Sequence, residues 1–203
     1  MPTPTFPKRD PATAEFWDLR YAAHFLPWDA GRVPADFQAF VAAQPLPLRA
    51  LVPGCGSGWE VRFLAERGWP VVGLDFSAEA LAAARPVAGP FADRLREGDV
   101  FAPIAEEPFQ LVYERAFLCA LPRRLWDDWA ERMATLVVPG GTLAGYFFID
   151  TSERGPPFPL HSDAELRALL EPAFERLEDR PVRDSLPVFA GKERWQRWRR
   201  RQA

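Results

Sequence analysis

Two short apolar runs mark the start of the central part of the chain. They are LRALV at residues 48–52 and VVGLD at residues 71–75. Short continuous apolar runs of this length, with a helical stretch between them, are typical of parallel strands buried on both faces. The pattern therefore predicts a strand–helix–strand unit, the building block of an α/β fold.

The helix inside this unit is predicted from its ends. Ser57 and Glu60 have the S-x-x-E spacing of a capping box, which places the helix start inside a glycine cluster. Gly68 follows the apolar repeat at a position suited to a left-handed C-terminal cap.

Further strands and helices alternate along the rest of the chain. Ser77 is expected to cap a helix that runs through Ala84 and that Pro86 ends. The remaining predicted elements are a weak strand at 93–97, a strand at 109–114, a helix at 122–138, a strand at 142–149, a helix opened by Ser162, and two closing strands at 176–183 and 186–198. This order predicts one α/β domain at residues 48–203.

Residues 1–47 differ in composition from the rest of the chain, because eight of its 22 prolines precede residue 48. Proline breaks helices, so we expect short helices separated by turns. The segment is also rich in aromatic residues, which favours an N-terminal arm or lid over a second domain.

Composition narrows the function. With 203 residues, 48% of them apolar, the chain can bury a core, and 25 basic against 28 acidic residues give a net charge of −3. This balance argues against nucleic acid or anionic lipid as a partner, although the basic segment 191–203 can be interpreted either as an RNA contact or, more simply, as a last strand. The absence of a long apolar run or an apolar leader favours a cytoplasmic location, and two widely separated cysteines favour reduced thiols over a disulfide. Two histidines and no cluster of Cys or His argue against a metal site. We also expect a monomer.

The clearest chemical motif is LVPGCGSG, a strand followed by Gly54, Gly56 and Gly58 at the start of a helix. Glycines permit a tight turn and let a ligand approach backbone N–H groups. Asp75 stands 21 positions after Gly54, at the end of the next strand, where a carboxylate can accept both hydroxyls of an adenosine ribose. Together these features predict a nucleoside site.

The glycine spacing favours one cofactor. A dinucleotide motif is G-x-G-x-x-G, whereas GCGSG has its third glycine one residue early, which favours S-adenosylmethionine over NAD. The Gly98-Asp99-Val100 turn can offer Asp99 to the adenine amino group, and an ordinary turn explains the same triplet equally well.

From Phe16 onward the chain resembles the thiopurine and thiol (thiocyanate, halide) S-methyltransferases. The matching segments include FWDLRY, LPWDAGRVP, LVPGCGSGWEVRFLAERGWPVVGLDFS, REGDVF, FQLVYERAFLCALP, VVPGGTL and RGPPFPLHSDAELRALL. The resemblance implies a class I methyltransferase fold with a seven-stranded, mostly parallel sheet flanked by helices. It also implies methyl transfer from S-adenosylmethionine to a small soft nucleophile, a thiol, thiopurine or thiocyanate-like anion, with S-adenosylhomocysteine as co-product.

The resemblance also implies site residues. The cofactor positions are Trp17, Trp28, Gly54, Gly56, Asp75, Asp99, Val100 and Arg115. Glu114-Arg115 is like the Asp-Arg of the thiopurine branch, whereas FLCALP and RGPPF look more like the thiol and halide branch, which usually has Tyr where Arg115 stands. Tyr21 occupies a position where several relatives carry Trp, and it is a candidate substrate contact with Phe158 of the Gly-Pro-rich loop.

The chemistry of methyl transfer fits these positions. An aromatic ring near a sulfonium gains a cation–π attraction, which suits Trp17 and Trp28 of a closing arm. Arg115 is the candidate catalytic residue, holding an anionic substrate or lowering a thiol pKa, with a structural ion pair to Glu114 or Asp99 as the alternative. Thiolates form readily near neutral pH, so no dedicated base is required. An O- or N-methyltransferase and a non-catalytic cofactor-binding module remain as alternative functions.

Overall fold

The computed structural model describes residues 4–106, 108–153 and 155–202, so the first three residues of the expected arm lie outside the described residues. A seven-stranded sheet with the order β3-β2-β1-β4-β5-β7-β6 forms its centre. The strands are β1 (Ala50–Pro53), β2 (Val71–Asp75), β3 (Leu95–Glu97), β4 (Phe109–Arg115), β5 (Val137–Phe148), β6 (Phe174–Pro181) and β7 (Glu193–Arg200). Strands β1 to β5 are parallel, and β7 is antiparallel to both β5 and β6. This confirms the predicted seven-stranded, mostly parallel sheet.

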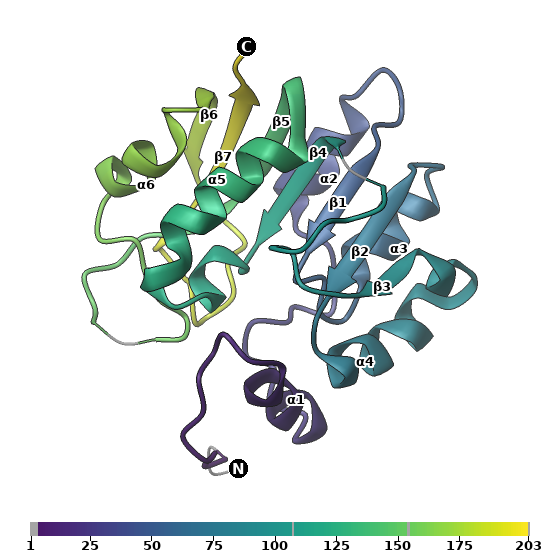
Figure 1. Ribbon diagram of the computed structural model, residues 1–203, viewed down its shortest axis with the longest axis vertical. Helices are drawn as coiled ribbons and strands as arrows, with labels where there is room; N and C mark the ends of the chain where they lie inside the picture. Colours follow the sequence, from purple (N-terminus) through teal and green to yellow (C-terminus); the bar gives the residue numbers. More distant parts are fainter. Residues whose placement is uncertain (1–3, 107, 154, 203) are drawn as a thin grey trace.

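Helices cover both faces of the sheet and one of its ends (Figure 1). They are α1 (Ala14–Ala22), α2 (Ala35–Ala42), α3 (Trp59–Ala65), α4 (Ala78–Ala88), α5 (Trp126–Leu136) and α6 (Asp163–Leu170). One core lies between the sheet and α5 and α6, where Trp129 and Leu166 are completely buried. A second core lies between the sheet and α2, α3 and α4, around Phe37 and Leu64. In Figure 1, α1 lies below the carboxyl ends of β1, β2 and β4. No helix among the described residues is long and apolar enough to cross a membrane.

Two predicted helix boundaries are wrong. Helix α4 is capped by Ser77, whose hydroxyl accepts the Ala80 N–H, but it continues past Pro86 to Ala88. Pro86 lies in the last turn, where it removes only one intrahelical hydrogen bond, and Gly89 (φ 57°) ends the helix instead. Helix α5 begins at Trp126, because residues 123–125 form a 3₁₀ turn.

The capping box predicted for α3 is also absent. Its N-cap is Gly58, in a left-handed conformation (φ 77°), and no side chain caps the helix. The Ser57 hydroxyl donates to Asp29 of the arm instead, at 2.5 Å. Glu60 therefore does not form a capping box with Ser57. It lies buried at the carboxyl end of the sheet.

The last predicted strand is shorter than expected. Of the segment 186–198, only the part from Glu193 onward pairs in the sheet. The residues before it form a loop that places the buried Phe189 ring against Phe148, with ring centroids 5.2 Å apart. Burial of this ring in a small separate cluster competes with extension of the strand.

The two helices of the arm have different surroundings. In α2, the Phe37 ring stacks on Tyr113 of β4 with centroids 3.7 Å apart, so this helix belongs to the core. Helix α1 lies against α4, where the Ser77 hydroxyl donates to Asp18 at 2.6 Å. Only the first helix and the following loop are therefore placed as a cover over the sheet end.

Candidate active site

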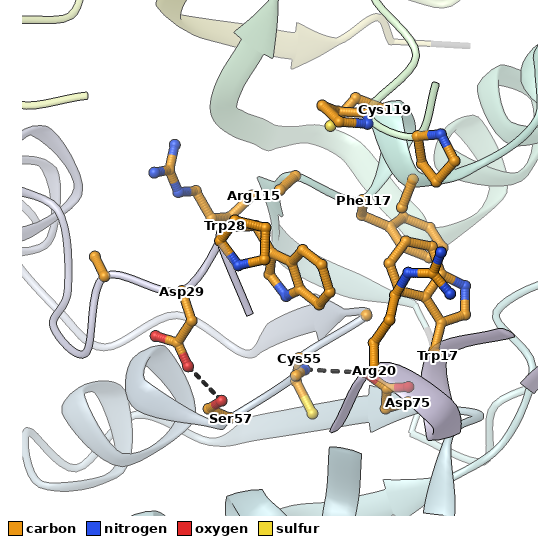
Figure 2. Close-up of a pocket in the computed structure, with 18 of the residues that line it drawn as sticks. Trp17, Arg20, Trp28, Asp29, Cys55, Ser57, Asp75, Arg115, Phe117 and Cys119 are labelled. Atoms are coloured by element: carbon orange, nitrogen blue, oxygen red, sulfur yellow. Dashed lines mark hydrogen bonds between the residues drawn. The ribbon is translucent and has the colours of Figure 1, made fainter. Parts of the chain in front are cut away.

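A cavity of about 230 Å³ opens at the carboxyl ends of β1, β2 and β4 (Figure 2). The arm, the glycine turn, the turn after β4, and two loops near the carboxyl end of β5 contribute to its walls. Ligands bind in α/β sheets of this kind at the carboxyl ends of the strands, where the strand order reverses. Strand β1 lies between β2 and β4 at such a point.

The glycine turn forms the floor of this cavity. Gly54 and Gly56 have φ angles of 59° and 50°, which residues with a side chain rarely adopt. A Cβ on Gly54 would lie 2.5 Å from the Phe117 ring, and one on Gly56 would lie 2.5 Å from the Tyr21 hydroxyl. The glycines therefore allow the turn to pass directly beneath two aromatic walls.

Asp75 lies beside this turn at the end of β2, with 8% of its surface exposed. Its carboxylate accepts the Gly56 N–H at 3.0 Å and the Ser77 N–H at 2.9 Å. Burial raises the pKa of Asp75 to about 6, against the opposing effect of these two hydrogen bonds. The group is therefore ionised at neutral pH and retains lone pairs for ligand hydroxyls.

Aromatic side chains of the arm gather over the cavity. The Trp28 ring contacts Trp17 and Tyr21 edge to face, with centroids 5.5 and 6.3 Å apart. The Asp29 carboxylate that binds Ser57 is on the same loop, and a dashed line marks this contact in Figure 2. The arm is thus attached to the glycine turn by a hydrogen bond close to the aromatic group.

Arg115 lies at the end of β4 and forms an ion pair with Glu193 at the start of β7. Its guanidinium lies 4.6 Å from the centroid of the Tyr146 ring. Burial is the largest single effect and acts to lower the pKa of Arg115, but Glu193 and the neighbouring Tyr113, Glu60 and Tyr146 together outweigh it, and the pKa is raised. An ion pair with Glu114 or Asp99, the structural alternative considered from the sequence, is not formed.

Glu114 instead holds the turn that follows β4. Its buried carboxylate accepts the Phe117 N–H at 2.9 Å and the Leu118 N–H at 3.1 Å. Burial raises the pKa of Glu114 to about 7. The turn passes through Ala116, which has a φ of 57°, so these hydrogen bonds help to hold a strained backbone on the cavity wall.

The structure brings together most of the residues singled out in the sequence. Those that line the cavity are Trp17, Tyr21, Trp28, Gly54, Gly56, Asp75 and Arg115. Asp99 and Val100 do not line it: the Asp99 carboxylate accepts the Phe101 N–H, and Val100 is buried in the core. Phe158 packs against that core and borders a separate small hollow, whereas Pro156 and Pro157 of its loop reach the main cavity.

Five charged or hydroxyl-bearing residues of the cavity are not among the predicted site residues: Arg20, Asp29, Arg32, Ser57 and Glu60. Asp29 follows Trp28 directly, and Arg20 lies one helical turn after Trp17. Their positions next to the two predicted tryptophans could have identified both as candidate site residues. The contact between Asp29 and Ser57 had none, because it joins segments 28 residues apart.

The cavity fits S-adenosylmethionine. Asp75 offers acceptors suited to ribose hydroxyls, and the arm offers ring faces and edges suited to a sulfonium. The Trp59 indole N–H is a further donor; it lies on the cavity wall and is buried without a partner among the described residues. Throughout the residues that the structure describes, no group of three or more His, Cys, Asp or Glu side chains is placed to hold a metal ion.

Solved structures define the class of the fold. A magnesium protoporphyrin IX methyltransferase from Synechocystis with bound S-adenosylmethionine superposes with a TM-score of 0.71 at 18% identity, covering 97% of this chain and all of that one. A second solved structure, from work on the conversion of a disulfide bond into a thioacetal group during echinomycin biosynthesis, superposes with a TM-score of 0.72 at 20% identity and covers 93% of each chain. The fold is that of a class I S-adenosylmethionine-dependent methyltransferase.

The family follows from sequence. The family model of thiopurine S-methyltransferase matches residues 12–201, and the chain belongs to this family. Thiocyanate methyltransferase 1 of Arabidopsis thaliana is 33% identical, with 91% of this chain and 84% of the relative covered. Thiopurine S-methyltransferase of Vibrio cholerae is 31% identical, with 79% and 81% covered. The predicted enzyme class, methyl donor and family resemblance are confirmed.

Proposed function

We propose that this methyltransferase acts on a thiol, a thiopurine or a thiocyanate-like anion. The observation that carries the proposal is the part of the cavity wall where one buried cation, Arg115, paired with Glu193, lies beside a group of small and apolar side chains. Such a wall suits a polarisable sulfur, which is desolvated at lower cost than a hard oxygen anion.

The donor supplies an electrophilic methyl group on a positively charged sulfur. The residues of this chain bind, orient and dehydrate the reactants. Asp75 binds the ribose hydroxyls, and the glycine turn lets the ligand lie against the backbone. Trp17 and Trp28 cover the sulfonium and exclude water, so that the methyl group and the nucleophile are held in line.

The acceptor side of the proposed site consists of small or apolar residues. They are Ala116, Cys119, Leu121, Pro157, Val188 and Phe189. Tyr21 reaches the cavity from the arm, and burial and the charge of Asp75 raise its pKa, so it is a neutral hydroxyl there. We keep Tyr21 as a substrate contact, and we reassign the pocket wall expected from Phe158 to Pro157 of the same loop.

Asp99 and Val100 are proposed for the adenine end of the donor. They follow β3, and the Gly98 N–H donates to the Asp75 backbone carbonyl at 3.0 Å, which ties their turn to the end of β2. Contact with the adenine would require this turn to move toward the ligand, because neither residue lines the cavity. An Asp99→Ala variant with unchanged calorimetric affinity for S-adenosylhomocysteine would contradict this role.

An acceptor screen tests the proposed function. Purified protein is incubated with methyl-labelled donor and thiopurines, aromatic and alkyl thiols, thiocyanate, iodide, catechols and amines, and labelled products are identified by mass spectrometry. We expect transfer to sulfur acceptors or iodide. Transfer only to catechols or amines would assign O- or N-methylation, and binding of donor without any transfer would favour the non-catalytic module.

We also propose that the protein is a cytoplasmic monomer with a small-molecule acceptor. Cys55 and Cys119 are buried free thiols, as expected for a reducing compartment. Light scattering coupled to gel filtration is expected to give one species of 23.0 kDa, and a species of twice that mass would contradict the monomer.

A further inference from the structure

Glu60 is a buried carboxylate on the cavity wall that has no hydrogen bond or ion pair to another residue in the part of the chain that the structure describes. It is 9% exposed and lies on the cavity wall. The two other carboxylates on this wall are engaged, since Asp75 accepts two backbone N–H groups and Asp29 accepts from Ser57 and the Gly31 N–H. Among residues 4–106, 108–153 and 155–202, the one group that donates to the Glu60 carboxylate is its own backbone N–H, so this carboxylate remains available to a ligand.

The groups that face Glu60 come from three other segments. They are Asp29 of the arm, Cys55 of the glycine turn, and Tyr113 and Arg115 of β4. Burial raises the pKa of both the Cys55 thiol and the Tyr113 phenol, so both are neutral. Arg115 is already paired with Glu193, and this pairing leaves Glu60 as a carboxylate that is not neutralised by a dedicated cation.

This environment suits a group that takes up and releases a proton near neutral pH. Burial raises the pKa of Glu60 to about 7, Asp29 acts in the same direction, and its own N–H and Arg115 oppose the shift. A general base is most effective when its pKa lies near the working pH. Glu60 thus combines position, freedom from other contacts and suitable basicity.

The sequence alone predicts no need for a base, but inside a desolvated cavity a base favours transfer to a thiol acceptor, whereas an inorganic anion gains nothing from it. An ordinary thiol has a pKa of about 8.5 and enters a dry cavity largely protonated. The ion pair with Glu193 limits how far Arg115 can favour the thiolate. Thiocyanate and iodide arrive ionised and carry no proton to remove.

We propose that Glu60 is the general base that deprotonates thiol acceptors, an inference that rests on the proposed function. The S–H bond of the acceptor breaks and its proton moves to the Glu60 carboxylate. The freed electron pair on sulfur forms the new S–CH₃ bond as the bond from the methyl group to the donor sulfur breaks and leaves its electron pair on that sulfur. The donor becomes neutral S-adenosylhomocysteine, and Glu60 then releases the proton to water.

The test compares Glu60→Gln with the parent protein on 2-mercaptoethanol and on thiocyanate. We expect kcat/KM for the thiol to fall by about 10²- to 10⁴-fold, the usual range for loss of a general base, and to lose its dependence on a group of pKa near 7. For thiocyanate we expect a change of less than about threefold, because no proton is transferred. Glu60→Asp should recover part of the thiol activity.

Binding and folding are measured independently of activity. Calorimetric affinity for S-adenosylhomocysteine should be unchanged within about threefold in Glu60→Gln, since an amide replaces the carboxylate with the same shape. Circular dichroism establishes that each variant is folded. Glu66→Gln is the matched control, because Glu66 is an exposed carboxylate at the end of the same helix, paired with Arg62 at 2.7 Å.

Each other outcome overturns the inference in a distinguishable way. Equal losses on thiol and thiocyanate, or a loss of S-adenosylhomocysteine affinity, would make Glu60 a cofactor-binding or structural residue. Unchanged thiol activity would exclude a base at this position. A parent protein that methylates only anions would refute the base and keep the proposed function, whereas one that methylates no soft nucleophile would refute both.

Discussion

The carboxylates of the cavity and those of the β6–β7 edge lie in opposite surroundings. At the edge, Glu175 pairs with Arg199 and Asp179 pairs with Arg194, at 2.5 and 2.6 Å. The hydrogen bond from Arg199 lowers the pKa of Glu175. In the cavity, Glu60 and Asp75 are buried and form no ion pair with any cation that the structure describes, and burial raises their pKa values.

The two groups of carboxylates have different roles. Exposed ion pairs between long side chains contribute little to stability, and they cost little because both groups stay hydrated. Charged side chains at a sheet edge also discourage pairing with strands of other molecules. Buried unpaired carboxylates cost stability, and a fold retains them where their chemistry is used. Three arginines of β7, Arg194, Arg197 and Arg199, pair with carboxylates of β6 within the sheet.

The largest effect is expected from Arg115→Met. This change leaves the Glu193 carboxylate buried without its cation, which costs about 3 to 5 kcal/mol of unfolding free energy. Urea unfolding measures the loss, and the double variant with Glu193→Gln should recover most of it. If Arg115 serves the acceptor, the double variant should bind S-adenosylhomocysteine normally and turn over slowly; the reverse would assign Arg115 to the cofactor.

A second prediction concerns the pH dependence of stability without ligand. Glu60 and Glu114 have pKa values of about 7 in the folded protein, above the ordinary 4.5, so folding takes up protons between these values. Stability should therefore fall as the pH rises from about 5 to 8, by on the order of 1 to 3 kcal/mol for each group. The unfolding free energy, measured with urea at several pH values, should depend less steeply on pH in Glu60→Gln than in the parent protein. Glu66→Gln should have the parental pH dependence. The same pH dependence in all three proteins would show that Glu60 ionises normally.

Asp75→Ala should weaken binding of S-adenosylhomocysteine by about 1 to 3 kcal/mol, because the ribose hydroxyls lose a buried acceptor. Titration calorimetry gives the difference. Asp93→Ala, at an exposed position before β3, is the control. An unchanged affinity in Asp75→Ala would remove its role in ribose binding.

The smallest effect is expected at the exposed edge. Glu175→Gln breaks the pair with Arg199, in which both side chains are about half exposed. We expect a loss of less than about 1 kcal/mol, reduced further by added salt. A loss as large as that of Arg115→Met would show that the edge and the cavity do not differ as described.

Much of the fold could be predicted because its signals are local. The apolar runs at β1 and β2, the glycine turn and Ser77 each define their element within a few residues. The failures depend on distant contacts. Pro86 is tolerated because it falls in a last turn, and the loop before β7 forms because Phe189 packs against Phe148 of another strand.

The site, like the fold, could be predicted where its residues belong to a local motif and could not be predicted where it depends on contacts between distant segments. Asp75 and the glycines follow from a motif in which neighbouring strands end together, and the structure places them in one cavity. Glu60 was assigned to a capping box, because its spacing from Ser57 is correct for one. The sequence does not show that Asp29 binds Ser57 from the arm, and that contact separates the two partners of the expected box.

A crystal structure with S-adenosylhomocysteine bound tests the central assignment most directly. The account predicts that the ribose hydroxyls bind the Asp75 carboxylate, that the rings of Trp17 and Trp28 cover the sulfur, and that this sulfur faces the wall formed by Arg115 and the turn after β4. A ligand bound elsewhere, or a cavity filled by side chains of the protein at saturating ligand, would contradict it.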